Sequence, residues 1–206
     1  MGDPNLALDL PANVTEPFLL HVGDIHERRN LPMLVDALLA ARRHFGAAAA
    51  LSLVLAGVDR GVSDGLCAMA AEAGAPDAVV ALGPGRARIV STRSTAARPR
   101  SSIRRCYEGF GLPLIEAMAS GTPVLASHEA SIPEVLGGAG LLLDPRDVSA
   151  WRDAIIRVVN DESLRDDLRA RGLRARRRIT WQRTGPAHAR RVSRGRPCSL
   201  TCRSSS

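Results

Sequence analysis

The chain has 206 residues, a length that suits one domain, or one domain with a tail. Apolar residues make up 45% of it and aromatic residues only 3%, so small aliphatic side chains must form the core. No apolar run reaches the roughly 20 residues of a membrane-spanning helix, and the acidic, polar first residues lack the features of a signal peptide. We therefore expect a cytoplasmic protein, with peripheral attachment to the inner face of the membrane as the alternative.

The positive charge is concentrated in two segments. All 28 basic residues are arginines; seven lie within residues 84–106 and twelve within residues 168–206, and neither segment contains an acidic residue. The rest of the chain carries nine arginines and all 21 acidic residues, so its net charge is −12 although the whole chain is +7. Such segments can bind nucleic acid or anionic lipid, but these have no regular pattern of aromatic residues and no known binding module. A nucleic-acid-associated protein is therefore only the third alternative.

The cysteines do not have the spacing of a metal site. Cys198 and Cys202 are separated by three residues, but no second pair accompanies them, and Cys67 and Cys106 are isolated. Unpaired thiols of a cytosolic protein explain this pattern better than a metal or disulfide framework. We expect no metal and no cofactor.

Apolar segments and helical patterns alternate along the chain. In chain order they predict a strand over 17–24, a helix over 30–45, a strand over 51–57, a helix over 63–74, a strand over 78–83, a helix over 113–120, a strand over 122–127, a helix over 131–138, a strand over 139–145, and helices over 147–161 and 162–178. Asn30 is the expected cap of the helix over 30–45, with Pro32 in its first turn. Ser131 and Glu134 have the spacing of a capping box.

This alternation predicts an α/β fold: a single Rossmann-like domain whose parallel sheet has helices on both faces. Such sheets bind ligands at the carboxyl ends of their strands. Two polar, glycine-containing turns fall at this edge, GDIHERRN at 23–30 and EGFGLP at 108–113.

The second turn has the chemistry of a diphosphate site. Glycines before a helix let an anion approach the free N–H groups at the positive end of that helix. Glu116 in the first helical turn suits a neutral diol such as ribose, and Glu108 before the turn can face a second polyol. Arg28 and Arg29 of the first turn could neutralise the phosphates. The plainer alternative is a surface loop with a capping glutamate.

Residues 107–127 and 131–147 closely resemble the donor-binding domain of the retaining glycosyltransferases of group 1 (family 4). Glu108 and Glu116 match that family's E-x7-E motif. Residues 18–42 are similar to its first strand, phosphate turn and helix, and the strands near 51–57 and 78–83 match the next two. The resemblance extends over residues 17–183.

The resemblance implies the GT-B fold, in which two Rossmann-like domains face each other across a cleft and the C-terminal one binds a nucleotide-diphosphate sugar. It implies that Glu116 holds the ribose, that Glu108 contacts the donor sugar as the catalytic residue, and that Arg29 replaces a phosphate-binding lysine. Asp24 departs from the family, which commonly has an arginine there. The complete predicted set of donor-binding residues is Gly23, Arg28, Arg29, Gly109, Phe110, Gly111, Leu112 and Glu116.

The family's acceptor-binding domain would precede the donor domain and is not in this sequence. We therefore expect an N-terminal extension over 1–16, a donor-binding domain over 17–183 and a basic, disordered tail over 184–206. The chain would then be the donor-binding half of a sugar transferase, inactive alone and partnered by a separate acceptor-binding domain. The runner-up is a non-catalytic remnant that only binds nucleotide sugars.

Residues 86–106 differ from the family, which has a helix and a buried strand here. The segment contains neither an apolar stripe nor an apolar run, and burying Arg104 and Arg105 unpaired would cost several kcal/mol each. We expect it to be disordered or looped out, leaving the sheet gapped beside Glu108. We hypothesise an altered reading frame, with a genuine basic insert as the alternative; the coding DNA read in its three frames distinguishes them.

Overall fold

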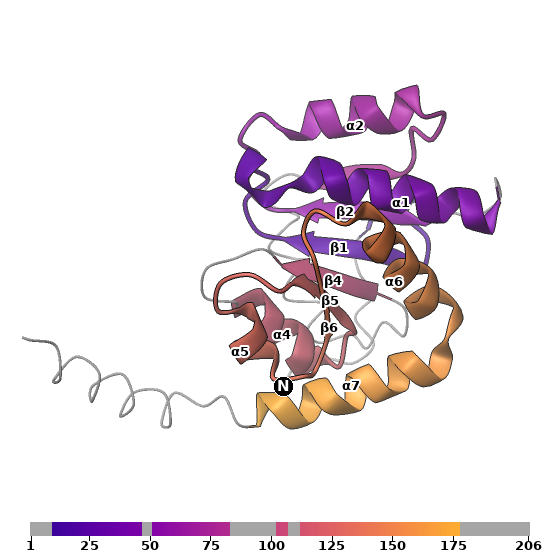
Figure 1. The fold of residues 1–206 in the computed structure, drawn as a ribbon. Coiled ribbons are helices and arrows are strands. Elements are labelled where there is room, and N and C mark those ends of the chain that lie inside the picture. The colour runs from indigo at the N-terminus through magenta and orange to yellow at the C-terminus, as the bar shows by residue number, and fades with distance from the viewer. Residues whose placement is uncertain (1–9, 47–50, 83–101, 107–111, 178–206) are drawn as a thin grey trace, which may run out of the picture.

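The computed structural model describes residues 10–46, 51–82, 102–106 and 112–177, the strand at 102–106 by its backbone alone. Six parallel strands form one sheet in the order β3-β2-β1-β4-β5-β6 (Figure 1). Their bounds are β1 Phe18–Val22, β2 Ser52–Ala56, β3 Val79–Leu82, β4 Ser102–Cys106, β5 Val124–Ser127 and β6 Leu141–Leu143. The predicted parallel α/β sheet is confirmed, and the carboxyl ends of all six strands lie along one edge.

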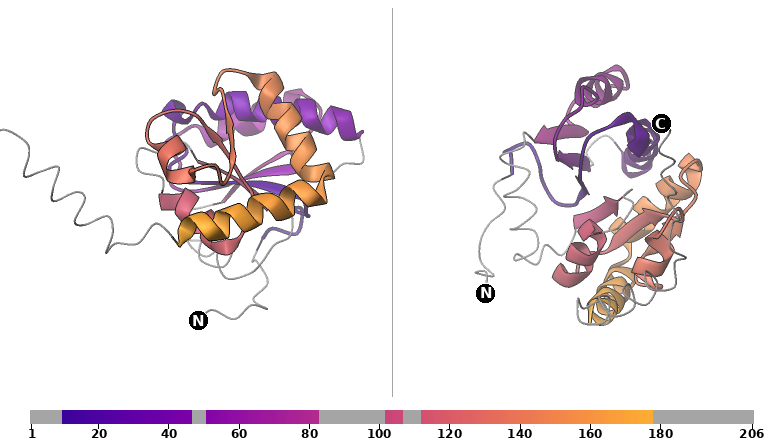
Figure 2. Two further views of the ribbon diagram at one scale, coloured as in Figure 1. Left: turned by 60° about the horizontal axis from the view of Figure 1, so that its bottom comes forward. Right: turned by 90° about the vertical axis from the view of Figure 1, so that its left-hand side faces the viewer.

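Helices lie on both faces of this sheet, as predicted. They are α1 Leu31–Phe45, α2 Ser63–Glu72, α4 Leu112–Ser120, α5 Ile132–Leu136, α6 Val148–Asn160 and α7 Glu162–Arg176, with a short 3-10 helix η1 at Glu27–Arg29. On one face α1 lies between α2 and α6; on the other, α4 packs beside α5 and α7. Figure 2 shows this arrangement from two further directions.

The core follows from the alternation of side chains along the buried strands. Leu19, Leu53 and Leu125 point to the face covered by α1, α2 and α6, and the fully buried Trp151 of α6 joins them. Val124 and Ala126 point to the opposite face, beneath α4 and α5. Because β1, β2 and β5 are covered on both faces, most of their residues are apolar, which is why the sequence predicts these strands well.

The prediction that residues 86–106 are looped out is wrong for residues 102–106. They form β4, which pairs with β1 on one side and with β5 on the other. The prediction considered only side chains. Without β4, the facing edges of β1 and β5 would leave backbone N–H and C=O groups unpaired in the interior. The rest of that segment lies outside the described residues.

Two predicted caps differ in detail. Asn30 is the N-cap residue of α1, but its side chain makes no capping hydrogen bond; its amide instead donates to the carbonyl of Pro145, 2.8 Å away. Ser131 precedes α5, yet its hydroxyl does not cap the helix, so the predicted capping box does not form. Pro32 lies in the first turn of α1, as predicted.

The predicted domain limits remain predictions, since residues 178–206 lie outside the described part of the chain. Val14, before the first strand, is buried and packs with Phe18 and Leu20. None of the described helices combines the length and hydrophobicity needed to cross a membrane.

Candidate functional site

The turns after β1 and β2 touch each other at the carboxyl edge of the sheet. Gly23 has a φ of 136°, and its N–H donates to the carbonyl of Ala56 at 3.0 Å. A Cβ atom on Gly57 would lie 1.7 Å from the carbonyl oxygen of Gly23, so only glycine fits there. Gly23 is thus held in place by the neighbouring turn.

Arg28 and Arg29 lie in η1, directly after the Gly23 turn. The N–H of Arg28 donates to Nδ1 of His26, which caps this short helix at 3.2 Å. Asn30 then adopts a left-handed conformation, and its bond to Pro145 ties the turn to the segment after β6. The fold therefore places both arginines at the ligand-binding edge, as the sequence predicts.

The N-terminus of α2 cannot serve as a phosphate site. Asp59 accepts hydrogen bonds from the N–H groups of Gly61, Val62 and Ser63 at 3.0–3.2 Å. The Ser63 hydroxyl and these N–H groups hold the pKa of the Asp59 carboxyl below its ordinary value of 3.8. A carboxylate of the chain itself thus occupies the place that an anion would take.

The predicted residues of the second turn are only partly within the described structure. Leu112 begins α4 and has an exposed fraction of 49%, and Glu116 is exposed in the next helical turn. Buried Leu114 and Met118 hold the helix against the sheet. Glu108, Gly109, Phe110 and Gly111 lie outside the described residues, so their predicted roles stay predictions.

The sheet order makes neighbours of β1 and β4, the two strands that the predicted turns follow in the sequence. β4 lies directly beside β1, and α4 follows the end of β4, so Gly23 with η1 and the start of α4 belong to adjacent positions on one edge. The two arginines therefore come from one turn, and the helix N-terminus with Glu116 from its neighbour.

The turn after β2, which is not among the predicted site segments, adds Arg60 to this edge. The Arg60 guanidinium pairs with the carboxylate of Asp24, which follows Gly23. A signal existed, because Val58–Gly61 is a polar, glycine-flanked turn after a buried strand, like the two turns that were recognised.

The histidines at this edge act as structural groups. His26 caps η1, and Nδ1 of His128 lies 3.0 Å from the carbonyl oxygen of Leu143. Within residues 10–46, 51–82 and 112–177, no three His, Cys, Asp or Glu side chains gather in a way that could hold a metal ion.

Known proteins match both the sequence and the fold. The O-antigen chain mannosyltransferase B of Escherichia coli is 47% identical over 76 residues, which are 37% of this chain and 20% of that protein. The C-terminal domain of a glycosyl transferase group 1 family protein from Francisella tularensis has a TM-score of 0.62 at 20% identity, covering 77% of this chain and 83% of that one. An Anabaena protein solved in complex with UDP and glucose has a TM-score of 0.69 at 19% identity, covering 86% and 48%.

The chain thus corresponds to a small part of its Escherichia coli relative and to about half of the Anabaena protein. A family model described as "Glycosyl transferases group 1" matches residues 5–175, which include both predicted turns. The chain therefore belongs to the glycosyl transferases of group 1.

Proposed function

We propose that this chain binds a nucleotide-diphosphate sugar and forms the donor side of a sugar transfer that proceeds with retention. The observation that carries the proposal is that β1 and β4, the strands after which the two predicted turns come in the sequence, are neighbours in the sheet. One turn presents Arg28 and Arg29, and the other leads into α4 with Glu116. A diphosphate between them would meet guanidinium groups on one side and a helix N-terminus on the other.

Each residue has a distinct role in this proposal. The exposed Glu116 carboxylate accepts hydrogen bonds from the ribose hydroxyls, and Glu108 contacts the donor sugar. In the transfer, the bond between the anomeric carbon and the diphosphate oxygen breaks, and the diphosphate leaves with the electron pair. A hydroxyl oxygen of the acceptor bonds to that carbon, and the hydroxyl proton passes to an oxygen of the departing diphosphate. Arg28, Arg29 and the N–H groups before α4 stabilise the charge that develops on the departing diphosphate. No step requires a metal.

This chain matches 20% of the Escherichia coli relative and covers 48% of the Anabaena protein, and in our proposal the remaining length of such relatives includes the acceptor side of the cleft. We propose that a separate acceptor-binding domain supplies it, because transfer needs two walls to orient both substrates and exclude water. The chain alone should then bind donor nucleotide without turnover. Mannose is the first sugar to test, given the name of the Escherichia coli relative.

Calorimetry on the full chain tests the donor site with ADP, GDP and UDP, and then with GDP-mannose and UDP-glucose. We expect at least one nucleotide to bind, and Glu116→Ala to weaken it by about 1.5–3 kcal/mol, the range for hydrogen bonds to charged groups. The variant should also lose discrimination between the ribonucleotide and its 2′-deoxy form, and Glu108→Ala should weaken the nucleotide sugar more than the free nucleotide.

Glu162→Ala is the matched control, since Glu162 is likewise an exposed glutamate near the start of a helix, α7, but follows no predicted ligand turn. It should leave binding unchanged. Equal affinities for wild type, Glu116→Ala and Glu108→Ala would overturn the proposed site.

A further inference from the structure

We propose that Asp24 and Arg60 form a charge pair that sets how tightly the donor site holds a diphosphate, with Arg60 attracting the ligand and Asp24 repelling it. This inference rests on the proposed function and adds to it a specificity device built from two turns. It assigns a role to a residue, Arg60, that belongs to neither of the turns predicted to bind the donor.

The pair is well defined. Nη2 and Nε of Arg60 lie 3.1 and 3.3 Å from one carboxylate oxygen, Oδ2 of Asp24. The side chains are about half exposed, 55% for Arg60 and 45% for Asp24, so a ligand at this edge can reach both. Within the described residues Nη1 of Arg60 makes no hydrogen bond, which leaves donors of the guanidinium available to a phosphate.

The backbone fixes Arg60 beside the β1 turn although it follows β2. Its N–H donates to the carbonyl of Ile25 at 3.0 Å, and the N–H of Ile25 donates to the carbonyl of Val58 at 2.9 Å. Ile25 itself is buried, so this connection has a rigid base. Because neighbouring strands lie about 4.8 Å apart, pairing with Asp24 brings the guanidinium about one strand closer to β4 and its turn.

The charges oppose each other in their effect on an anion. Asp24 follows Gly23 directly, so its carboxylate stands at the turn expected to meet the diphosphate and would repel it. Arg60 cancels that charge by contact and adds an attractive group of its own. The pair as a whole is neutral. Removing either partner would change the net charge of this part of the site by one unit.

The contribution of the pair to folding is small, because solvent screens half-exposed ion pairs and ordering two long side chains costs entropy. Arg60→Ala and Asp24→Asn both break the same ion pair, so a purely structural role would make both variants behave alike. The proposed role instead gives them opposite signs. This difference makes the two explanations separable.

The experiment measures affinity for the nucleoside diphosphate that binds wild type best, by calorimetry at low salt on the full chain. Arg60→Ala should bind it about 3- to 30-fold more weakly, and Asp24→Asn more tightly by a similar factor. The double variant should return near the wild-type affinity. Higher salt should reduce both effects, since exposed charges are screened.

Arg171→Ala is the matched control: Arg171 pairs with Asp167, and those side chains are 51% and 43% exposed. It should not change the affinity. The nucleoside without phosphates should bind all variants equally. Shifts of Arg60→Ala and Asp24→Asn in the same direction, or unchanged affinities in variants of a chain that does bind the diphosphate, would overturn this inference alone. A wild-type chain that binds no nucleoside diphosphate would overturn both it and the proposed function.

Discussion

Among the described residues, Ala130 has the backbone conformation least suited to its residue type. It lies between β5 and α5 with a φ of 53°, in the left-handed region. Asn30 shares this conformation in the described part of the chain, but asparagine tolerates it and alanine does not. The exposed Ala130 side chain has little packing to offset the strain.

Ala130→Gly should therefore stabilise the protein. A left-handed backbone conformation destabilises an alanine by about 1–2 kcal/mol. Glycine avoids this strain, but its greater conformational entropy in the unfolded chain reduces the gain in stability. We expect a net gain of about 0.5–1 kcal/mol in the free energy of unfolding, measured by urea denaturation. Ala170→Gly, within α7, is the control and should lower stability by a similar amount. A loss of stability in Ala130→Gly would contradict the assignment of strain.

At the residue scale the sequence predicted positions better than contacts. It placed Gly23, Arg28 and Arg29 on the turn after the first strand, at the carboxyl edge of the sheet, and Glu116 in the helix α4, where the structure has them; their roles in binding stay predictions. It gave Asn30 a local capping role, whereas the side chain reaches Pro145, 115 positions away. Capping rules use only neighbours in sequence, so they cannot anticipate a partner that the folded sheet supplies.

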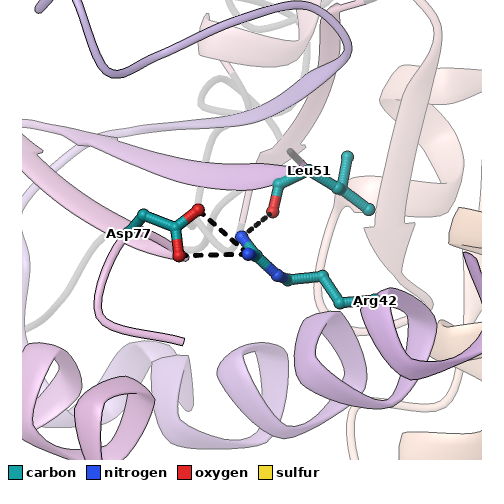
Figure 3. A network of polar contacts seen from close by, with 3 residues as sticks. All are labelled: Arg42, Leu51 and Asp77. Carbon is teal, nitrogen blue, oxygen red and sulfur yellow. Dashed lines mark hydrogen bonds and ion pairs between the residues drawn. The ribbon is translucent and has the colours of Figure 1, made fainter. Parts of the chain in front are cut away.

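Among the elements, α1 is anchored at its C-terminal end by Arg42 (Figure 3). Nη1 donates to the carbonyl of Leu51 at 2.9 Å, and Nη2 reaches the two carboxylate oxygens of Asp77 at 2.9 and 3.1 Å. One side chain thus connects α1 to the residue before β2 and to the segment before β3. Its exposed fraction is only 13%, so these contacts are partly shielded from water.

Replacing Arg42 by methionine should loosen this corner of the domain. Methionine keeps the aliphatic stem but removes every donor, and hydrogen bonds to charged groups contribute about 1.5–3 kcal/mol. Since Asp77 is half exposed, we expect a loss near the lower limit, about 1–2 kcal/mol, in urea denaturation. Arg43→Met, at the adjacent exposed position, should change stability by less than about 0.5 kcal/mol. Equal effects of the two substitutions would show that the anchor contributes nothing.

Element prediction succeeded wherever side-chain pattern and backbone pairing agree. The strands β1 and β2 are continuous apolar runs with a buried centre, and both were predicted. The strand β4 was not predicted because its sequence, SIRRC, has no such pattern. Its position depends on the two strands that flank it. The pattern of apolar residues is judged one segment at a time, whereas the hydrogen bonding of a central strand depends on three strands, the strand itself and its two neighbours.

In the whole molecule, β4 joins the part built from residues 10–82 to the part built from residues 112–177. Arg104 is in register with Leu20 and Val124, and Arg105 with His21 and Leu125, all of them buried. Two arginines therefore occupy positions in the central strand whose neighbours on both sides are core residues.

Changing Arg104 and Arg105 together to valine should stabilise the whole domain. Valine favours a central strand and arginine does not, a difference of about 1 kcal/mol at each position, and the residues in register on both neighbouring strands are buried. Thermal denaturation should show a higher midpoint and one sharper transition, because the two parts would be joined more firmly. Arg152→Val, on the exposed surface of α6, serves as the control without a gain. A lower midpoint for the double variant would mean that the arginines stabilise this register.

The order of the strands limits how much of the proposed donor site could be predicted from the sequence. The turns after β1 and β4 are recognisable from their glycines and charges, but their adjacency is a consequence of the strand order. The turn that carries Arg60 could have been recognised in the same way, but the contact of Arg60 with Asp24 could not, because it joins two turns 36 positions apart. Only the order β2-β1-β4 shows that this arginine lies beside the predicted phosphate turn.

The packing of α6 against α1 has a consequence for the biosynthesis of the chain. Trp151 and Ile155 of α6 complete the same core as Leu34 and Leu38 of α1. A ribosome releases α1 long before α6, so the nascent domain carries an uncovered apolar helix face while most of its sequence is still being translated. Residues 10–46 and 51–82 contain three strands and two α-helices, and the core that they share with α6 is complete only once Asn160, the last residue of α6, has emerged.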